Sequence, residues 1–319
     1  MLVTPAFFAD PIPDDITIQS LQVGTSGRVM DAPSRGDASP NISVIFIYGH
    51  HALIERWWGL IAQLREYGRV IAPDLPGFGG MSPCAGDEDL IDQLAQHVKL
   101  VIDKMAPTGD LILAGVSFGF AVLTRLLECF PELIPRVRLL VSFSGFVSGD
   151  NLNTPLLVRL GVQFLKLCSS YDHINILANR FLIRRTTIAS IDRVIGATRR
   201  RSATMSKAQR SELVGIETFL WRTNDLATHW STMTWALTAP APASSISVCV
   251  THVSFDNDPY VLHETIARRL REIFNEVAVL LIPGDTHTPD LNAPLCAYTV
   301  YLPDFLRDQL RGIGTMEKR

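Results

Sequence analysis

The sequence predicts an α/β fold, in which a mostly parallel, doubly wound sheet carries helices on both faces. Continuous apolar runs, such as Val44 to Tyr48 and Leu111 to Val116, are typical of strands that are buried on both faces. These runs alternate with segments that carry apolar residues at helical spacing. From residue 151 to 240 only helix-like segments follow one another, which indicates a helical unit inserted into the α/β core.

The first half of the chain contains most of the predicted core. Alternating apolar residues over 15–24 predict a half-buried strand, and the Gly-, Ser-, Asp- and Pro-rich stretch 24–40 predicts a hairpin connection. Helices and strands then alternate, with strands expected at 44–48, 70–73, 111–116 and 138–144 and helices at 57–67, 87–105 and 121–130.

The second half begins with the inserted unit. Its helix-like segments cover 155–167, 174–182, 188–198 and 207–221. Sheet character returns at 246–253, and a helix around 267–270, a last strand over 277–282 and a terminal helix from about residue 293 follow. We therefore expect a core domain formed by 1–148 and 241–319 and a helical cap formed by 149–240.

Composition excludes several classes of protein. The chain has 319 residues, of which 47% are hydrophobic and 19% charged, enough to bury a large core. A net charge of -3 gives no global attraction to nucleic acid or to an anionic membrane, so a small-molecule substrate is favoured. The five cysteines lack Cys-x-x-Cys spacing and predict neither a disulfide framework nor a zinc site.

The N-terminal stretch carries no targeting signal that we identify. It has no basic region, and Pro5 and Asp10 interrupt its apolar residues. No window of 18 uncharged apolar residues occurs in the chain. We expect a cytoplasmic protein without a membrane span.

The motif Gly-x-Ser-x-Gly, formed by Gly115, Ser117 and Gly119, follows a predicted strand and precedes a predicted helix. A serine at the apex of so sharp a turn has crowded neighbours, and glycine two residues to either side removes the collisions. In this context the sequence resembles the serine hydrolase branch of the α/β-hydrolase fold superfamily. The resemblance covers residues from about 42 to 145 and 246 to 308 and implies that Ser117 is a nucleophile.

The resemblance also implies two partners for Ser117. Residues 255–261 resemble the acid loop of the family, in which Asp258 precedes a proline, and Asp256 is the rival candidate. Residues 283–289 resemble the histidine loop and contain His287. The order Ser, Asp, His is the one that this fold uses.

The resemblance further implies an oxyanion hole formed by the backbone N–H groups of His50 and Phe118. Tyr48 stands where the family usually has a histidine, which leaves the support of this loop open. Metal binding by His50 and His51 is the alternative, but adjacent side chains diverge and no carboxylate cluster lies nearby. Asp74 is expected to be structural, because the acid of the triad follows the serine in sequence.

The inserted segment is expected to roof the active site and to line a substrate cavity, as a cap does in this family. We expect Phe219, Trp221 and Tyr260 to contact the substrate. Further cavity candidates in the insertion are apolar or aromatic: Phe164, Leu167, Phe181, Trp230, Met233 and Trp235. Residues 184–210 hold eight Lys and Arg and one Asp, which favour a solvated helix face over attraction of an anionic substrate tail or a carrier protein.

The implied reaction is hydrolysis of a carboxylic ester, thioester or lactone through an acyl-enzyme, without a metal or organic cofactor. Ser117 disfavours the dehalogenase and epoxide hydrolase branches, which have an aspartate at the elbow. Carbon–carbon bond hydrolysis is an alternative, although that branch often has a tryptophan after its histidine and this chain has Thr288. Acyl transfer and a receptor-like, ligand-binding role stay open.

Overall fold

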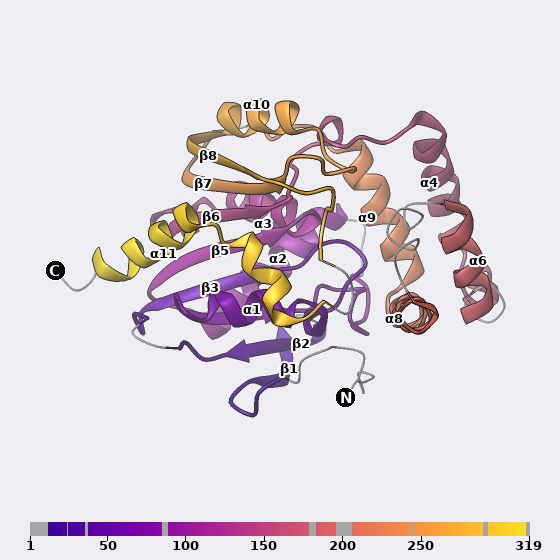
Figure 1. Ribbon diagram of the computed structural model, residues 1–319, viewed down its shortest axis with the longest axis horizontal. Coiled ribbons are helices and arrows are strands. Elements are labelled where there is room, and N and C mark those ends of the chain that lie inside the picture. Colours follow the sequence, from indigo (N-terminus) through magenta and orange to yellow (C-terminus); the bar gives the residue numbers. More distant parts are fainter. Residues whose placement is uncertain are drawn as a thin grey trace.

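The computed structural model describes residues 12–23, 25–35, 38–84, 89–178, 183–195, 206–243, 245–289 and 293–316 (Figure 1). Its centre is an eight-stranded sheet with the strand order β1-β2-β4-β3-β5-β6-β7-β8. The β1–β2 and β2–β4 pairs are antiparallel, and every other pair is parallel. The predicted fold class, a mostly parallel α/β sheet, is confirmed.

The strands follow the apolar runs of the sequence with one exception. Their bounds are β1 (Thr17–Val23), β2 (Thr25–Ala32), β3 (Ile42–Ile47), β4 (Arg69–Pro73), β5 (Asp110–Val116), β6 (Val137–Phe143), β7 (Ile246–Phe255) and β8 (Phe274–Ile282). The prediction of a hairpin connection over 24–40 is wrong, because β2 occupies much of it. Polar neighbours conceal this strand in the sequence, yet Val29, Met30 and Ala32 are fully buried in the sheet.

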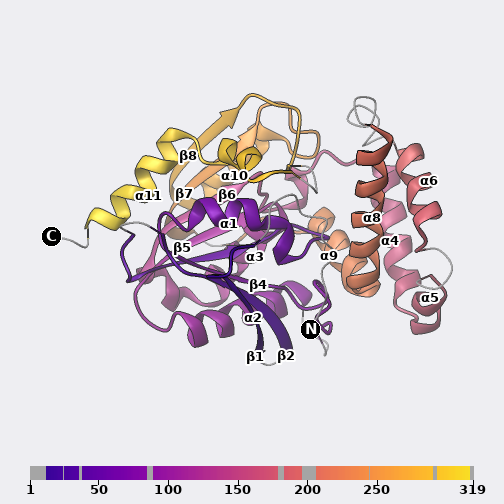
Figure 2. The same cartoon turned by 60° about the horizontal axis from the view of Figure 1, so that its bottom comes forward.

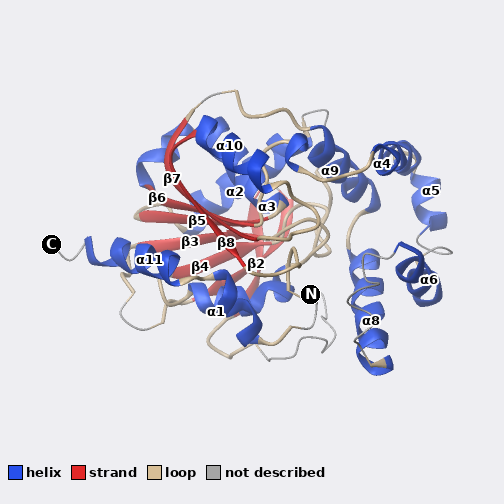
Figure 3. Cartoon of the chain, turned by 45° about the horizontal axis from the view of Figure 1, so that its top comes forward, coloured by secondary structure: helices blue, strands red, loops and turns tan. Residues whose placement is uncertain are grey.

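Helices cover both faces of the sheet. Figure 3 shows α2 (Leu90–Met105), α3 (Phe118–Cys129) and α10 (His263–Ile273) on one face and α1 (Trp58–Leu64) and α11 (Asp304–Met316) on the other. Short 3₁₀ segments are η1 (Ile54–Trp57), η2 (Pro131–Arg136) and η5 (Leu295–Tyr301). The last helix therefore does not start near residue 293 as predicted. A 3₁₀ segment comes first, and α11 begins after Pro303.

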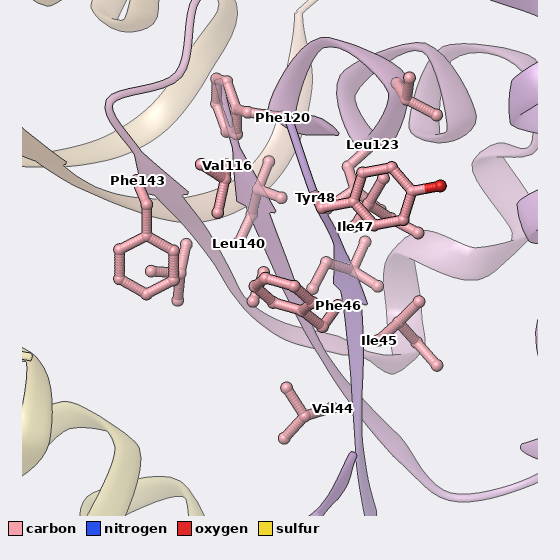
Figure 4. Close-up of a cluster of buried hydrophobic side chains, with 14 of the residues drawn as sticks. Val44, Ile45, Phe46, Ile47, Tyr48, Val116, Phe120, Leu123, Leu140 and Phe143 are labelled. Atoms are coloured by element: carbon pink, nitrogen blue, oxygen red, sulfur yellow. The ribbon is translucent and has the colours of Figure 1, made fainter. Parts of the chain in front are cut away.

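The middle of the core lies around β3 (Figure 4). Val44, Phe46 and Tyr48 come from this strand and its end, and all three are fully buried. Phe120 of α3 and Phe143 of β6 are fully buried in the same apolar cluster. Strands with apolar residues on both faces need helices on both sides, which explains why the continuous runs predicted a layered α/β protein.

Between β6 and β7 the described residues form helices and their connections, apart from an isolated bridge of Leu152 with Val261; we call residues 149–240 the helical insertion. Its described elements are η3 (Gly149–Asn151), α4 (Leu156–Ser169), α5 (Asp172–Leu177), α6 (Arg185–Ile195), α8 (Lys207–Thr223) and α9 (Leu226–Thr238). Figure 2 shows α4, α5, α6 and α8 grouped at one end of the molecule, beyond α9. The division into a core and a cap stays a prediction. Parts of two predicted helices, 179–182 and 196–198, lie outside the described residues.

Helix α9 was not among the predicted helices. Its four threonines at 228, 232, 234 and 238 have modest helix propensity, so the sequence pattern is weak there. In the structure the Asp225 side chain caps the helix by accepting a hydrogen bond of 2.7 Å from the backbone N–H of Thr228. The hydroxyl of Thr232 donates back to the carbonyl of Thr228, which satisfies a buried polar group inside the helix.

A buried polar network fastens the loops at the ends of β3 and β4. The guanidinium of Arg28 lies 2.6 Å from Glu55 and 2.5 Å from Asp74, whose side chain is fully buried. The Tyr48 hydroxyl donates to Asp74 over 3.0 Å and accepts from the backbone N–H of Leu75 over 2.9 Å. Tyr48 thus supports the loops after β3 and β4, a support that the sequence left open. Asp74 takes part in this network and also accepts a hydrogen bond of 3.1 Å from the backbone N–H of Ile54.

Among the described residues, no helix has the length and apolar character that crossing a membrane requires.

We expect Tyr48→Phe to lower the free energy of unfolding by about 1 to 3 kcal/mol, because it leaves the Leu75 N–H buried without its acceptor. Urea unfolding at neutral pH measures this difference. Tyr67→Phe is the matched control, since the hydroxyl of Tyr67 makes no hydrogen bond within the described part of the chain. Equal losses in both variants would mean that the Tyr48 hydroxyl contributes nothing specific.

Candidate active site

Ser117 stands on a strained turn between β5 and α3. Its backbone has φ 49° and ψ -115°, a conformation that residues other than glycine rarely adopt. A Cβ atom on Gly115 would come within 2.6 Å of the backbone of Phe120, and one on Gly119 would overlap the carbonyl oxygens of Ile47 and Tyr48. Both glycines are therefore required by close backbone approach.

The structure brings Ser117, His287 and Asp258 together. His287 Nε2 lies 2.9 Å from Ser117 Oγ, and His287 Nδ1 lies 2.7 Å from Asp258 Oδ2. Because the carboxylate accepts the hydrogen bond from Nδ1–H, a neutral His287 has Nε2 free to accept the serine proton. The three residues follow β5, β8 and β7, whose carboxyl ends meet at one edge of a parallel sheet.

Asp258 and Asp256 have different surroundings. The side chain of Asp258 is fully buried, and its second oxygen accepts a hydrogen bond of 2.9 Å from the Tyr260 N–H. Asp256 is exposed, and its Oδ1 accepts from the backbone N–H of Gly284 over 3.0 Å. Asp258 contacts His287, whereas Asp256 ties together the loops after β7 and β8.

Phe118 and Gly49, the residue before His50, lie next to Ser117. Phe118 is the first residue of α3, so its N–H has no acceptor within the helix. The backbone at Gly49 passes so near that a Cβ atom there would lie 3.3 Å from Ser117 Cβ. The predicted role of the His50 and Phe118 N–H groups is consistent with these positions, and it stays a prediction.

The side chains of His50 and His51 contact the helical insertion. His50 Nε2 donates to the carbonyl oxygen of His229 in α9 over 3.1 Å. His51 Nδ1 lies 3.1 Å from His229 Nδ1, and the rings of both residues lie 4.4 Å from the ring of Trp221. The described part of the chain has no group of three or more His, Cys, Asp or Glu suited to a metal.

Burial keeps these histidines neutral. It lowers the pKa of His50 to about 4. Burial and the charge that neighbouring rings would carry also lower the pKa of His51 and of His229 well below the usual value. The cluster of His50, His51 and His229 therefore carries no charge near pH 7. Nothing in the sequence indicated His229, because it joins this cluster only through the fold.

The predicted substrate-contact residues have different positions. The ring of Tyr260 lies 5.3 Å from that of His287, and half of the Tyr260 surface is exposed. Phe219 packs beside the apolar cluster of Leu53, Ile216 and Leu220, and Trp221 packs on the histidines. We keep substrate contact by these three residues as a proposal.

The other cavity candidates have different positions, and Met233 of α9 is partly buried. Trp235 lies 5.8 Å from the ring of Phe118, and Trp230 packs on Trp221. The prediction is wrong for Phe164 and Leu167, which are exposed because α4 turns its other face to α9. Phe181 and the arginines at 199–201 lie outside the described residues.

A family model described as the alpha/beta hydrolase family matches residues 44–305 of the chain. No curated protein sequence matches significantly. Many solved structures are similar, among them an epoxide hydrolase from Bacillus megaterium, which has a TM-score of 0.64 and 15% identity and covers 92% of this chain and 100% of its own.

Two further solved structures have other names. An esterase from Thermogutta terrifontis gives a TM-score of 0.59 at 15% identity and covers 93% of this chain and 99% of its own. A putative lipase from Acinetobacter baumannii gives a TM-score of 0.66 at 14% identity, with 93% of each chain covered. At such identities the likeness shows the fold.

The buried histidines predict a pH dependence of stability. As pH falls from about 6.5 to about 4, the unfolded chain binds protons that the folded His50 does not bind, so the free energy of unfolding decreases. In His50→Gln, which keeps an N–H donor, we expect a decrease that is shallower by up to about 1.4 kcal/mol per pH unit. Urea titrations across this range measure both slopes.

Gln163→Asn provides the control, because Gln163 is exposed on α4 and carries no titratable group, so this variant should leave the slope as in the wild type. An unchanged slope in His50→Gln would show that the folded protein protonates His50 as readily as the unfolded chain does.

Proposed function

The chain belongs to the alpha/beta hydrolase family, and on that premise we propose that it hydrolyses carboxylic esters, including thioesters and lactones, through a serine nucleophile. The observation that carries the proposal is the position of His287 between Ser117 and Asp258, at 2.9 and 2.7 Å. A buried carboxylate, a histidine and a serine in this geometry are what acyl transfer to serine requires.

In the proposed reaction, Ser117 Oγ attacks the acyl carbonyl while His287 Nε2 takes the hydroxyl proton. Asp258 orients the imidazole and stabilises its charged form. Collapse of the tetrahedral adduct expels the alcohol or thiol, which receives the proton from His287. Water, deprotonated by His287, then attacks the acyl-enzyme and releases the carboxylic acid, which restores Ser117.

We assign the stabilisation of the developing oxyanion to the backbone N–H groups of His50 and Phe118. Such donors contribute roughly 3 to 4 kcal/mol each to transition-state stabilisation in comparable sites. The side chain of His50 is held by the carbonyl of His229, which supports a fixed position for the loop that carries the first donor. Reorganisation during the reaction is then small.

The nucleophile favours ester chemistry over epoxide opening. The Bacillus megaterium neighbour is named an epoxide hydrolase, and the resemblance implies an aspartate at the elbow of that branch. This chain has Ser117 there, a residue that forms acyl intermediates. The names of the esterase and putative lipase neighbours agree with the proposal.

The helical insertion is assigned the selection of the acyl group. Trp221 packs on the His51 and His229 rings, and the Trp235 ring approaches Phe118, so α8 and α9 reach the elements that carry Ser117. Tyr260 approaches His287 from the opposite loop. Aromatic side chains from both sides suit an apolar acyl chain.

A fluorophosphonate probe tests the class of the protein. We expect rapid labelling of the wild type and none of Ser117→Ala, because only an activated serine attacks the phosphorus. Turnover of soluble acyl esters should fall by at least about a thousandfold in Ser117→Ala, with the fold intact. Ser190→Ala, which removes an exposed hydroxyl bonded within α6, is the control and should label as the wild type does.

Labelling of the folded wild type that does not exceed the background measured with Ser117→Ala would contradict the proposal and favour a ligand-binding member of the family.

The carboxylates provide a second test. Asp258→Asn should reduce kcat by about two to four orders of magnitude, because the imidazole loses its orienting charge. Asp256→Asn keeps an oxygen for the Gly284 N–H and should change kcat by less than about threefold. Steady-state kinetics of both folded variants give the ranking. The reverse ranking would show that Asp256, and not Asp258, is the acid of the triad.

A further inference from the structure

The positive charge of the chain is concentrated in one stretch. Residues 156–210 hold eleven Lys and Arg and only two acidic residues, Asp172 and Asp192, although the whole chain has a net charge of -3. Such a local excess in an acidic chain indicates an anionic partner more strongly than the overall charge does. The stretch begins at α4 and includes α5, α6 and the start of α8.

Helix α4 presents an apolar face to solvent. Leu157 is 82% exposed and Phe164 is 65% exposed. Leu156, Leu160 and Leu167 are exposed with them, at spacings that place all five on one side of the helix. The opposite side carries the buried residues of α4, and the helix packs against α9. An amphipathic helix normally buries its apolar face, so this orientation requires an explanation.

Exposed apolar residues also occur next to α4, in and before α5. Tyr171, Ile176 and Leu177 in and before α5 are also more than half exposed. Figure 3 shows α4, α5 and α6 along the edge of the molecule that lies farthest from the sheet. We call the exposed apolar residues of α4 and α5 the outer face of the insertion. Contiguous apolar surface beyond about 300 to 600 Å² on a protein marks a contact with another protein or with lipid.

Exposed basic residues belong to the same group of helices as this outer face. Lys166 of α4 is exposed, and Arg184 and Arg185 are exposed at the start of α6. A helix with leucine and phenylalanine on one face and Lys or Arg beside them binds in the plane of a lipid headgroup layer. Each basic residue near an anionic bilayer adds about 1 kcal/mol of attraction. With 14 residues, α4 is about 21 Å long, which suits this orientation along the surface.

We propose that the outer face of the insertion binds the surface of an anionic lipid bilayer, with α4 lying parallel to it and its apolar side chains among the headgroups. A second copy of the chain fits less well, because pairing this face with itself would bring two strongly basic stretches together. Nucleic acid fits less well because the exposed leucines would gain nothing from phosphates. This binding does not depend on the proposed ester hydrolysis.

Flotation of the full chain with vesicles tests the proposal. We expect binding to phosphatidylcholine vesicles that contain phosphatidylglycerol, weaker binding at high salt, and little binding to phosphatidylcholine alone. Leu157→Ser combined with Phe164→Ser should weaken binding by at least about tenfold, because two apolar side chains leave the bilayer. Lys166→Gln combined with Arg184→Gln should reduce the preference for anionic vesicles.

Leu281→Ser combined with Phe305→Ser is the matched control, since these residues are exposed on β8 and α11, outside the insertion. It should bind vesicles as the wild type does. All substituted positions are exposed, and circular dichroism and thermal unfolding verify the fold of each variant.

Three results would overturn the proposal: no vesicle binding by the wild type, equal binding by the Leu157→Ser, Phe164→Ser variant, or equal binding to neutral and anionic vesicles. If sedimentation instead showed that the wild type is a dimer and that the Leu157→Ser, Phe164→Ser variant is a monomer, the outer face would bind a second copy of the chain. Fluorophosphonate labelling is measured without lipid, so failure of the hydrolase proposal and failure of this one give different results.

Discussion

The close approach of α3 to the end of β3 is the constraint on which the site depends. Gly119 packs so tightly on the carbonyl oxygens of Ile47 and Tyr48 that no Cβ atom fits between them. This contact forces the chain into the sharp turn at Ser117 and brings the loop after β3 beside it. Ser117, the N-terminus of α3 and the backbone at Gly49 meet at one place because two backbones touch without an intervening side chain.

The sequence predicted the features that local pattern encodes. Continuous apolar runs located the parallel strands, and a strand–turn–helix motif located Ser117, because each signal lies within a few residues. Asp258 and His287 were chosen from their loops, and the structure places both beside Ser117. Their catalytic roles stay proposals. The local sequence of each loop was enough to choose these residues, because the carboxyl ends of neighbouring parallel strands lie at the same edge of the sheet.

The remaining features depend on tertiary contacts. Strand β2 has a polar sequence and is fixed by pairing with both β1 and β4. Helix α9 has modest propensity and is stabilised by its Asp225 cap and by packing on α4. The contact of His50 with His229 joins positions 179 residues apart, and no local pattern predicts such a pair. The exposed face of α4 is also invisible in sequence, since periodicity gives a helix face but not the direction in which it points.

The hydrogen bond between His50 and His229 depends on the side chain of His50 but only on the main chain of His229. The donor is a side chain, but the acceptor is a main-chain carbonyl of α9. Substitution at 229 leaves that acceptor in place as long as the helix persists, whereas residue 50 must supply a donor of similar reach. This hydrogen bond between the loop beside Ser117 and the insertion therefore tolerates substitutions at residue 229. The sequence of the insertion can therefore change at this position while the loop that it holds keeps its place.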